Sequence, residues 1–239
     1  MIRVDDAHYR YPGRGTALCG VTATFPQGLT LVAGPNGGGK STLLLVLSGL
    51  FVPDAGTVRG GNGEPLSAGR LRALSRLVMQ EADPQLLGAT VEEDVALGKP
   101  SSALAPERFA AESARLARLL GLDGLWSAPV DALSCGGKRK LCLLHALLAG
   151  PELLLLDEPF AALDYPASRE LREFVIGQRD RGVSLVVSTH DLEPLFDVAD
   201  WLVVLAEGKA VREGRPAELS GELAGLAVRP PGAFAGAED

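Results

Sequence analysis

Apolar and polar positions repeat with two different periods along this chain. Short apolar runs and alternating stretches, both typical of strands, are bounded by turn residues. They cover residues 3–11, 20–25, 29–33, 57–58, 76–80, 153–157, 183–188, 201–205 and 210–211. The run at 153–156 is apolar throughout, which is typical of a strand that a sheet buries on both faces.

Helical spacing dominates the middle of the chain. A capping box at 90–93 predicts a short helix, Pro106 predicts the start of a longer one, and Ser134 is a suitable N-cap for a helix through 141–148. A further helix is expected at 166–179. The apolar side of the helix after Pro106 is expected to carry Phe109, Leu116, Leu119 and Leu120.

The order of these elements predicts an α/β fold with an insertion. We expect an α/β core near 1–80 and 151–220, with antiparallel strands at its N-terminus, and an inserted helical lobe near 81–150. The segment 221–239 is rich in Gly, Ala and Pro, and we expect it to be loosely ordered.

The first chemical motif follows the strand at 29–33. The stretch 34–42 reads Gly-Pro-Asn-Gly-Gly-Gly-Lys-Ser-Thr and leads into the apolar run 43–47. This order of strand, glycine-rich turn and helix is the context in which G-x-x-x-x-G-K-[ST] forms a phosphate loop. A glycine-rich turn with a solvated lysine is the alternative interpretation, and the complete motif disfavours it.

The residue types of this loop suit a nucleoside triphosphate. Backbone N–H groups from glycines and from the helix N-terminus can surround phosphates. Lys40 is expected to contact the β- and γ-phosphates, and the Ser41 hydroxyl to bind Mg²⁺. The predicted ATP-binding residues of the loop are Asn36, Gly37, Gly38, Gly39, Lys40, Ser41 and Thr42.

A second motif ends the apolar strand at 153–156. Asp157 and Glu158 follow it, at the end of a strand where parallel sheets place ligand chemistry. Asp157 can hold Mg²⁺, and Glu158 can accept the proton of an attacking water. A helix cap is the alternative for such a pair, and the phosphate loop favours the catalytic role.

Composition narrows the environment and the partners. The chain has 239 residues, a net charge of −7 and three cysteines without a C-x-x-C pair. The negative charge disfavours nucleic acid as a partner, and the cysteines give no support to disulfides or a zinc site. We find no apolar run of membrane-spanning length and no signal peptide at the N-terminus. We therefore expect a soluble cytoplasmic protein that reaches a membrane only through a partner.

A third motif, Leu-Ser-Cys-Gly-Gly-Lys-Arg-Lys at 133–140, indicates a family. The chain resembles the ATP-binding cassette (ABC) ATPases, whose signature reads Leu-Ser-Gly-Gly-Gln. The resemblance covers nearly the whole chain and includes Tyr11, Gln80, Asp164 and His190. It argues against a P-loop kinase or GTPase.

Part of the helical lobe is similar to a narrower group. The stretch 80–87 followed by Thr-Val-Glu-Glu-Asp-Val at 90–95 resembles the ATPase subunits of energy-coupling factor (ECF) importers, which take up vitamins and cobalt or nickel ions. Glu81 and Ala82 replace the Asn-Pro of that group. The basic run 138–140 is also similar, although a solvated face remains a sufficient explanation for it.

The resemblance implies a site shared by two subunits. Two ATP molecules lie between paired chains, with Ser134, Gly136 and Gly137 contacting the γ-phosphate bound by the other chain. It also implies that His190 and Gln80 join Lys40 and Glu158 in catalysis, although a capping or core histidine is the alternative for His190. Gln80 would be a third Mg²⁺ ligand beside Ser41 and Asp157. Tyr11 would stack on adenine, although a core aromatic remains an alternative.

The signature departs from the family pattern at two positions. Cys135 stands where the first glycine belongs, and Gly137 where the glutamine belongs. We expect a functional ATPase, and a bulkier residue 135 could slow it.

The resemblance implies a peripheral ATPase at the cytoplasmic face of the cell membrane. It would pair with a second ATPase subunit, identical or different, and a membrane subunit would dock near 80–94. The alternative is a soluble ABC protein of repair, translation or iron–sulfur assembly.

Overall fold

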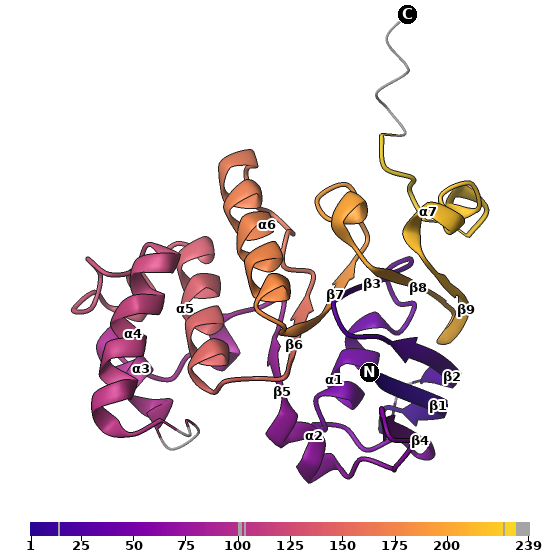
Figure 1. Cartoon of the computed structure of the whole chain (residues 1–239), viewed down its shortest axis with the longest axis horizontal. Helices are drawn as coiled ribbons and strands as arrows, with labels where there is room; N and C mark the ends of the chain where they lie inside the picture. The colour runs from indigo at the N-terminus through magenta and orange to yellow at the C-terminus, as the bar shows by residue number, and fades with distance from the viewer. Residues whose placement is uncertain (14, 100–101, 103, 227, 233–239) are drawn as a thin grey trace, which may run out of the picture. The chain divides into compact units, whose positions relative to one another are not determined.

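Two compact units make up the chain. In the computed structural model, residues 1–13, 15–99, 102, 104–226 and 228–232 are described. Unit 1 comprises Met1–Leu77 and Leu153–Asp239, and unit 2 comprises Val78–Glu152 (Figure 1). Among the described residues, no helix combines the length and apolar character needed to cross a membrane.

Unit 1 is built on two sheets. A three-stranded antiparallel sheet has the order β2-β1-β4, and a six-stranded sheet has the order β5-β6-β7-β3-β8-β9. Strands β3, β6, β7 and β8 run parallel, and β9 is antiparallel to β8. The strands are β1 (Ile2–Arg10), β2 (Thr16–Phe25), β3 (Leu29–Ala33), β4 (Ala55–Gly60), β5 (Ser75–Val78), β6 (Leu153–Asp157), β7 (Ser184–Thr189), β8 (Trp201–Ala206) and β9 (Lys209–Gly214). The predicted α/β class and its N-terminal antiparallel strands are confirmed.

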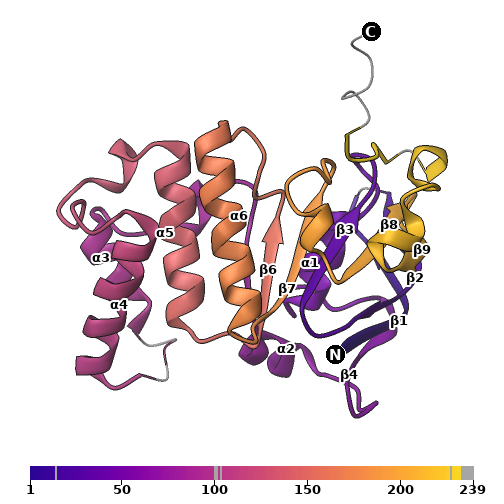
Figure 2. The ribbon, with the colours of Figure 1, turned by 45° about the horizontal axis from the view of Figure 1, so that its top comes forward.

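Helix α1 (Lys40–Leu47) is buried in the core of unit 1. Its leucines share one apolar cluster with inward-facing residues of both sheets, including Val4, Leu155 and Val186. Because side chains alternate along a strand, Leu154 and Leu156 face the other side of β6. Helix α6 (Tyr165–Asp180) lies in front of β6 and β7 in Figure 2, whereas α1 lies behind them.

The sequence analysis did not predict helix α2 (Ala68–Leu74) of unit 1. This helix precedes β5, and the Ser67 hydroxyl caps it by accepting a hydrogen bond from the Arg70 N–H. The buried residue of this helix is Leu71. One buried position gives no repeating apolar pattern, so the helix is hard to recognise in the sequence.

Unit 2 is helical. Its elements are η1 (Asp83–Gln85), α3 (Val91–Leu97), α4 (Pro106–Leu120), η3 (Val130–Ala132) and α5 (Cys135–Leu148). The Thr90 and Ser134 hydroxyls cap α3 and α5, as their sequence patterns predict. Helix α4 buries Phe109, Leu116 and Leu120, but Leu119 is 48% exposed, so its predicted inward position is wrong. At 100° per residue, Leu119 lies at the edge of that stripe.

The C-terminal segment differs from the expectation of loose order. Within 221–232, residues Leu223–Leu226 form a 3-10 turn (η5) after α7 (Pro216–Leu219). Leu223 and Val228 are fully or almost fully buried. Burial of these two apolar side chains explains why Gly and Pro content was a poor guide here. Residues 233–239 lie outside the described residues.

Candidate nucleotide-binding and catalytic site

The carboxyl ends of three parallel strands bring the motif residues of unit 1 together. Ala33 of β3 pairs with Thr189 of β7, and Asp157 of β6 pairs with Ser188. The phosphate loop follows β3, Glu158 follows β6 and His190 follows β7. This is the edge of a parallel sheet at which ligand chemistry is found.

Glycines shape the phosphate loop between β3 and α1. A side chain at Gly34, whose φ is 146°, would place its Cβ 2.0 Å from the Leu205 carbonyl oxygen. At Gly39, φ is 100° and a Cβ would lie 2.7 Å from the Ala17 oxygen. Gly37 has a φ of 77° and open space around it. The loop is therefore packed against β8 and β2 on one side and open on the other.

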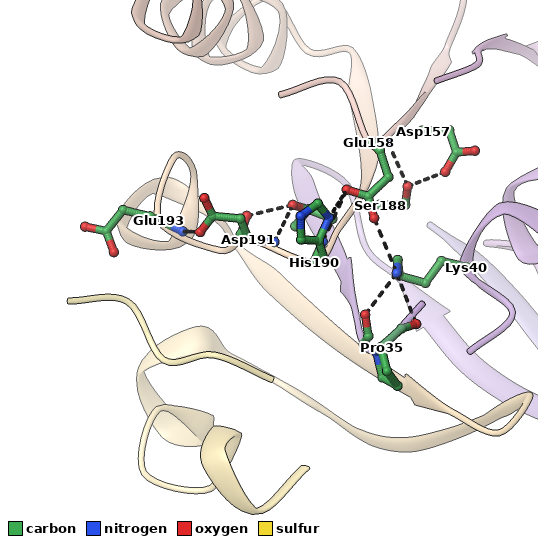
Figure 3. Close-up of polar contacts among 10 residues, drawn as sticks. Pro35, Lys40, Asp157, Glu158, Ser188, His190, Asp191 and Glu193 are labelled. Atoms are coloured by element: carbon green, nitrogen blue, oxygen red, sulfur yellow. Dashed lines mark hydrogen bonds and ion pairs between the residues drawn. The ribbon is translucent and has the colours of Figure 1, made fainter. Parts of the chain in front are cut away.

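Lys40 is the charged centre of this loop (Figure 3). Its Nζ donates to the Gly34 oxygen at 2.9 Å and to the Pro35 oxygen at 3.3 Å. The same Nζ lies 3.3 Å from Glu158 Oε1, and both side chains are less than a tenth exposed. The buried ammonium is thus compensated by two carbonyls and one carboxylate.

Glu158 connects Lys40 to His190. Its Oε2 lies 2.8 Å from His190 Nδ1 and accepts a bond from the His190 N–H at 3.3 Å. The Glu158 backbone has a φ of 46°, a left-handed conformation that is strained for a residue with a side chain. Bonds from its N–H to the Ser188 carbonyl and hydroxyl, at 3.1 and 3.0 Å, hold this conformation.

Ser188 is a site residue that the sequence analysis did not single out. Its hydroxyl donates to Asp157 Oδ1 at 2.5 Å while accepting from the Glu158 N–H. It therefore fixes two adjacent acidic residues from the neighbouring strand (Figure 3). The signal in the sequence was a serine directly after the apolar run 185–187, and the structure buries this serine fully.

The donor groups near the loop suit a hard cation. Ser41 is exposed at the start of α1, and Asp157 is 6% exposed at the end of β6, so a hydroxyl and a carboxylate oxygen are available in unit 1. Gln80 is exposed and belongs to unit 2. Across the described ranges, no group of three or more His, Cys, Asp or Glu side chains could hold a metal ion. A hydroxyl and a carboxylate are too few to enclose a metal ion, but they suit Mg²⁺ whose other ligands are phosphate oxygens and water.

Tyr11 belongs to an aromatic cluster. Its ring meets Tyr9 and Phe51 edge to face, with centroids 5.2 and 5.7 Å apart, and its hydroxyl lies 3.2 Å from Thr42 Oγ1. A pocket of about 760 Å³ is lined by Tyr11 and its neighbours His8, Tyr9, Arg10, Pro12, Gly13, Thr16, Asp54 and Ala55. Tyr11 therefore combines core packing on one side with a pocket on the other.

The signature residues lie in unit 2, at the start of α5. Ser134 and Cys135 are exposed, and the Ser134 hydroxyl accepts from the Gly137 N–H at 3.1 Å. That N–H is therefore already bonded within the helix cap. Gly136 is half-buried, and a Cβ there would only meet the Ser134 hydroxyl at 3.9 Å.

The basic run after the signature has partners in unit 2. Lys138 Nζ lies 2.5 Å from Asp83 Oδ1, and the Arg139 guanidinium donates to the Gln80 carbonyl at 3.2 Å. A purely solvated face is therefore the wrong interpretation for Lys138 and Arg139. The sequence could not reveal these contacts because both partners lie more than fifty residues earlier.

Comparison with known proteins identifies the family. Residues 18–161 match the family model described as "ABC transporter". The chain belongs to the ABC transporter ATP-binding protein family. It is 38% identical to the cobalt import ATP-binding protein CbiO of Rhodobacter capsulatus, over 93% of this chain and 82% of the relative. Identity to the energy-coupling factor transporter ATP-binding protein EcfA of Methanocaldococcus jannaschii is 31%, over 93% and 82%.

A solved ABC structure has the same fold. The structure of cbiO1 from Clostridium perfringens, described as part of the ABC transporter complex cbiONQ, superposes with a TM-score of 0.80. It is 28% identical, over 92% of this chain and 90% of that one. The resemblance to ABC ATPases of the cobalt and ECF type, inferred above from motifs, is confirmed.

Proposed function

We propose that this ABC protein hydrolyses ATP to drive an ECF-type importer of a vitamin or of cobalt or nickel ions. The observation that carries the proposal is the contact of buried Lys40 with buried Glu158, and of Glu158 with the exposed His190, at the open side of a phosphate loop. Relatives named for cobalt import and for energy-coupling factor transport favour an importer over a soluble ABC protein of repair, translation or iron–sulfur assembly.

ATP binding would use the loop and the first turn of α1. Backbone N–H groups at Asn36, Gly37, Gly38 and Gly39, together with those of Ser41 and Thr42, would surround the phosphates. Lys40 would exchange its contact with Glu158 for the β- and γ-phosphates. The pocket beside Tyr11 supports a place for adenine against that ring.

Glu158 is proposed to take the proton of the attacking water. His190 holds the Glu158 carboxylate through Nδ1 at 2.8 Å and is more than half exposed, so its other ring face could meet the γ-phosphate. The left-handed backbone at Glu158 aims the carboxylate between Lys40 and His190. Positioning of this kind is the main requirement of phosphoryl transfer.

Mg²⁺ would accompany ATP and neutralise charge on its phosphates. The groups of this chain proposed to hold it are the Ser41 hydroxyl and the Asp157 carboxylate, with the Gln80 side chain as a third ligand. Ser188 would keep Asp157 in place through its 2.5 Å hydrogen bond.

The complete site is proposed to need a second ATPase subunit, identical or different. Ser134, Gly136 and Gly137 of that subunit would contact the γ-phosphate, which the exposed Ser134 at a helix N-terminus supports. A membrane subunit would dock near Gln80–Asp94, where Leu87 is 81% exposed. The protein would then lie at the cytoplasmic face of the membrane as a peripheral subunit.

Replacement of Glu158 by glutamine tests the proposal. Glu158→Gln should lower the ATPase rate by about 10²- to 10⁴-fold, because the base is lost, while ATP binding remains. With ATP and Mg²⁺ the variant should accumulate as a dimer in light scattering. The control is Glu152→Gln, an exposed position just before β6, which should leave the rate unchanged. Full turnover by Glu158→Gln would remove Glu158 from this role.

A further inference from the structure

A buried carboxylate in unit 2 has no part in the proposed hydrolysis. The Asp94 side chain, on α3, is 2% exposed. Its Oδ1 accepts hydrogen bonds from the Leu87 and Gly88 N–H groups, both at 2.7 Å, and its Oδ2 lies 2.6 Å from His145 Nε2. A buried carboxylate is costly without such partners, so the site is built to keep it charged.

The segment that Asp94 holds presents an apolar side chain to solvent. Leu87 is 81% exposed, although its own N–H is fixed by the buried carboxylate. Gly88 is packed so closely that a Cβ there would lie 2.3 Å from the Asp94 nitrogen. The loop is thus fixed in a position that leaves Leu87 uncovered, within the segment where the membrane subunit is proposed to dock.

Helix α5 contacts residues 80–94, which include the Leu87–Gly88 loop. Four residues of the helix have hydrogen-bond or ion-pair partners there. These contacts are Lys138–Asp83, Arg139–Gln80 carbonyl, Cys142–Ala82 carbonyl and His145–Asp94. At 100° per residue, positions 138, 139, 142 and 145 fall within one third of the helix circumference. The polar strip of α5, as we name these four residues, therefore joins the segment to the helix that begins at the signature.

We propose that Asp94 and His145 are positioning residues that transmit contact at Leu87 to helix α5 and so to the signature at its start. His145 is eleven residues after Ser134, roughly 17 Å along the helix axis. A helix shifts as a rigid body, so a displacement of the Leu87–Gly88 loop would move Asp94, His145 and the signature end together. The inference rests on the proposed function, because it assumes that ATP and a membrane subunit act on this unit.

The electrostatics of the pair support a charged Asp94. Burial acts to raise the Asp94 pKa, but the hydrogen bonds from His145, Gly88 and Leu87 together bring that pKa below its ordinary value. With Asp94 ionised, His145 Nε2 acts as the donor. A charge-assisted hydrogen bond of this kind is stronger than a neutral one, so Asp94 and His145 are expected to move together.

Hydrogen exchange can test the link in the whole chain. In the Glu158→Gln background, ATP with Mg²⁺ should slow exchange at the Leu87 and Gly88 amides by at least about fivefold, as dimer formation fixes the signature. Adding His145→Leu should remove this change while ATP still binds, and His145→Gln, which keeps a donor, should restore it. Without the Glu158 change, His145→Leu should keep the basal ATPase rate within about twofold.

Two controls keep the outcomes distinct. Asp123→Asn alters an exposed side chain of unit 2 outside the polar strip and the signature, and it should leave the exchange response intact. If His145→Leu does not fold by circular dichroism, Asp94→Asn decides, because its remaining oxygen still accepts from Leu87 and Gly88. The inference is wrong if the dimer forms without any change of exchange at Leu87 and Gly88. It is also wrong if His145→Leu keeps the full response. Neither outcome affects the proposed function. Failure of the Glu158→Gln chain to dimerise overturns the inference and the identical-subunit form of the proposed function, whereas loss of ATP hydrolysis by the unmodified chain would overturn the proposed function itself.

Discussion

The two units differ in how exposed their proposed functional residues are. In unit 1, Lys40, Asp157 and Glu158 are at most 7% exposed and bonded to groups of that unit. In unit 2, Ser134 and Cys135 are exposed at the start of α5, and Leu87 is exposed at the loop that Asp94 holds. The proposed catalytic groups of unit 1 are therefore already in contact with one another without a ligand. In unit 2, the signature residues and Leu87 are exposed to solvent.

Cysteine reactivity gives the largest expected contrast and tests how exposed the signature is. Cys135 is exposed, whereas burial raises the pKa of Cys142, on the same helix, to about 12. At pH 8, iodoacetamide should modify Cys142 roughly a thousandfold more slowly than an ordinary exposed thiol. Mass spectrometry of timed samples measures this.

ATP and Mg²⁺ should then protect Cys135 if the signature meets nucleotide in a dimer. Cys142 labelling at the rate of an exposed thiol would show that α5 is not packed as described. Equal Cys135 labelling with and without nucleotide would remove that residue from the shared site.

Loss of the buried ammonium should break the preorganised site of unit 1. Lys40→Met should weaken ATP binding by about a hundredfold, since a charge-assisted contact with phosphate is worth roughly 1.5–3 kcal/mol. Fluorescent nucleotide titration measures the change. Lys209→Met, an exposed lysine of β9, is the matched control and should bind normally. Near-normal affinity in Lys40→Met would mean that the loop backbone alone carries binding.

Removal of the Ser188 hydroxyl should weaken the same site without emptying it. Ser188→Ala leaves Asp157 Oδ1 and the Glu158 N–H each with one bond fewer. We expect kcat to fall about tenfold with a smaller change in KM, because the lost hydrogen bond to buried Asp157 costs about 1–1.5 kcal/mol while the Glu158 N–H keeps its bond to the carbonyl of residue 188. Ser184→Ala, at the other end of β7, should keep wild-type kinetics. An unchanged kcat would mean that Ser188 only fills space.

Acid should reveal a change of stability in unit 2 rather than of turnover. The folded-state pKa of Asp94 is lowered from 3.8, so its stabilising contribution is present above about pH 4 and disappears as pH falls through the folded value. Asp94→Asn should therefore cost about 1–3 kcal/mol of unfolding free energy at pH 7 and less below pH 3.8.

Urea titrations at several pH values measure this difference. Asp123→Asn, at an exposed aspartate of unit 2, controls for a general loss of charge. A cost that stays constant down to the lowest pH would contradict the lowered pKa.

Local patterns were sufficient for much of the fold. Gly34, Gly39 and Lys40 were recognisable because a phosphate loop needs particular residue types at adjacent positions. Ser134 was recognisable as a cap because capping depends on a few neighbouring groups. Helix α2 and the buried residues of α4 were harder to predict, since short helices and the edges of an apolar stripe give weak periodicity.

The sequence alone determined the chemistry that this protein carries: a phosphate loop, an acidic pair after a buried strand and a signature-like helix start. Only the tertiary structure decided which distant residues meet. The ion pair of Lys40 with Glu158, the role of Ser188 between two acids and the hold of Asp94 on Leu87 and Gly88 depend on strand register and helix packing. Such contacts join residues far apart in sequence, and packing of the whole chain selects them rather than any local preference.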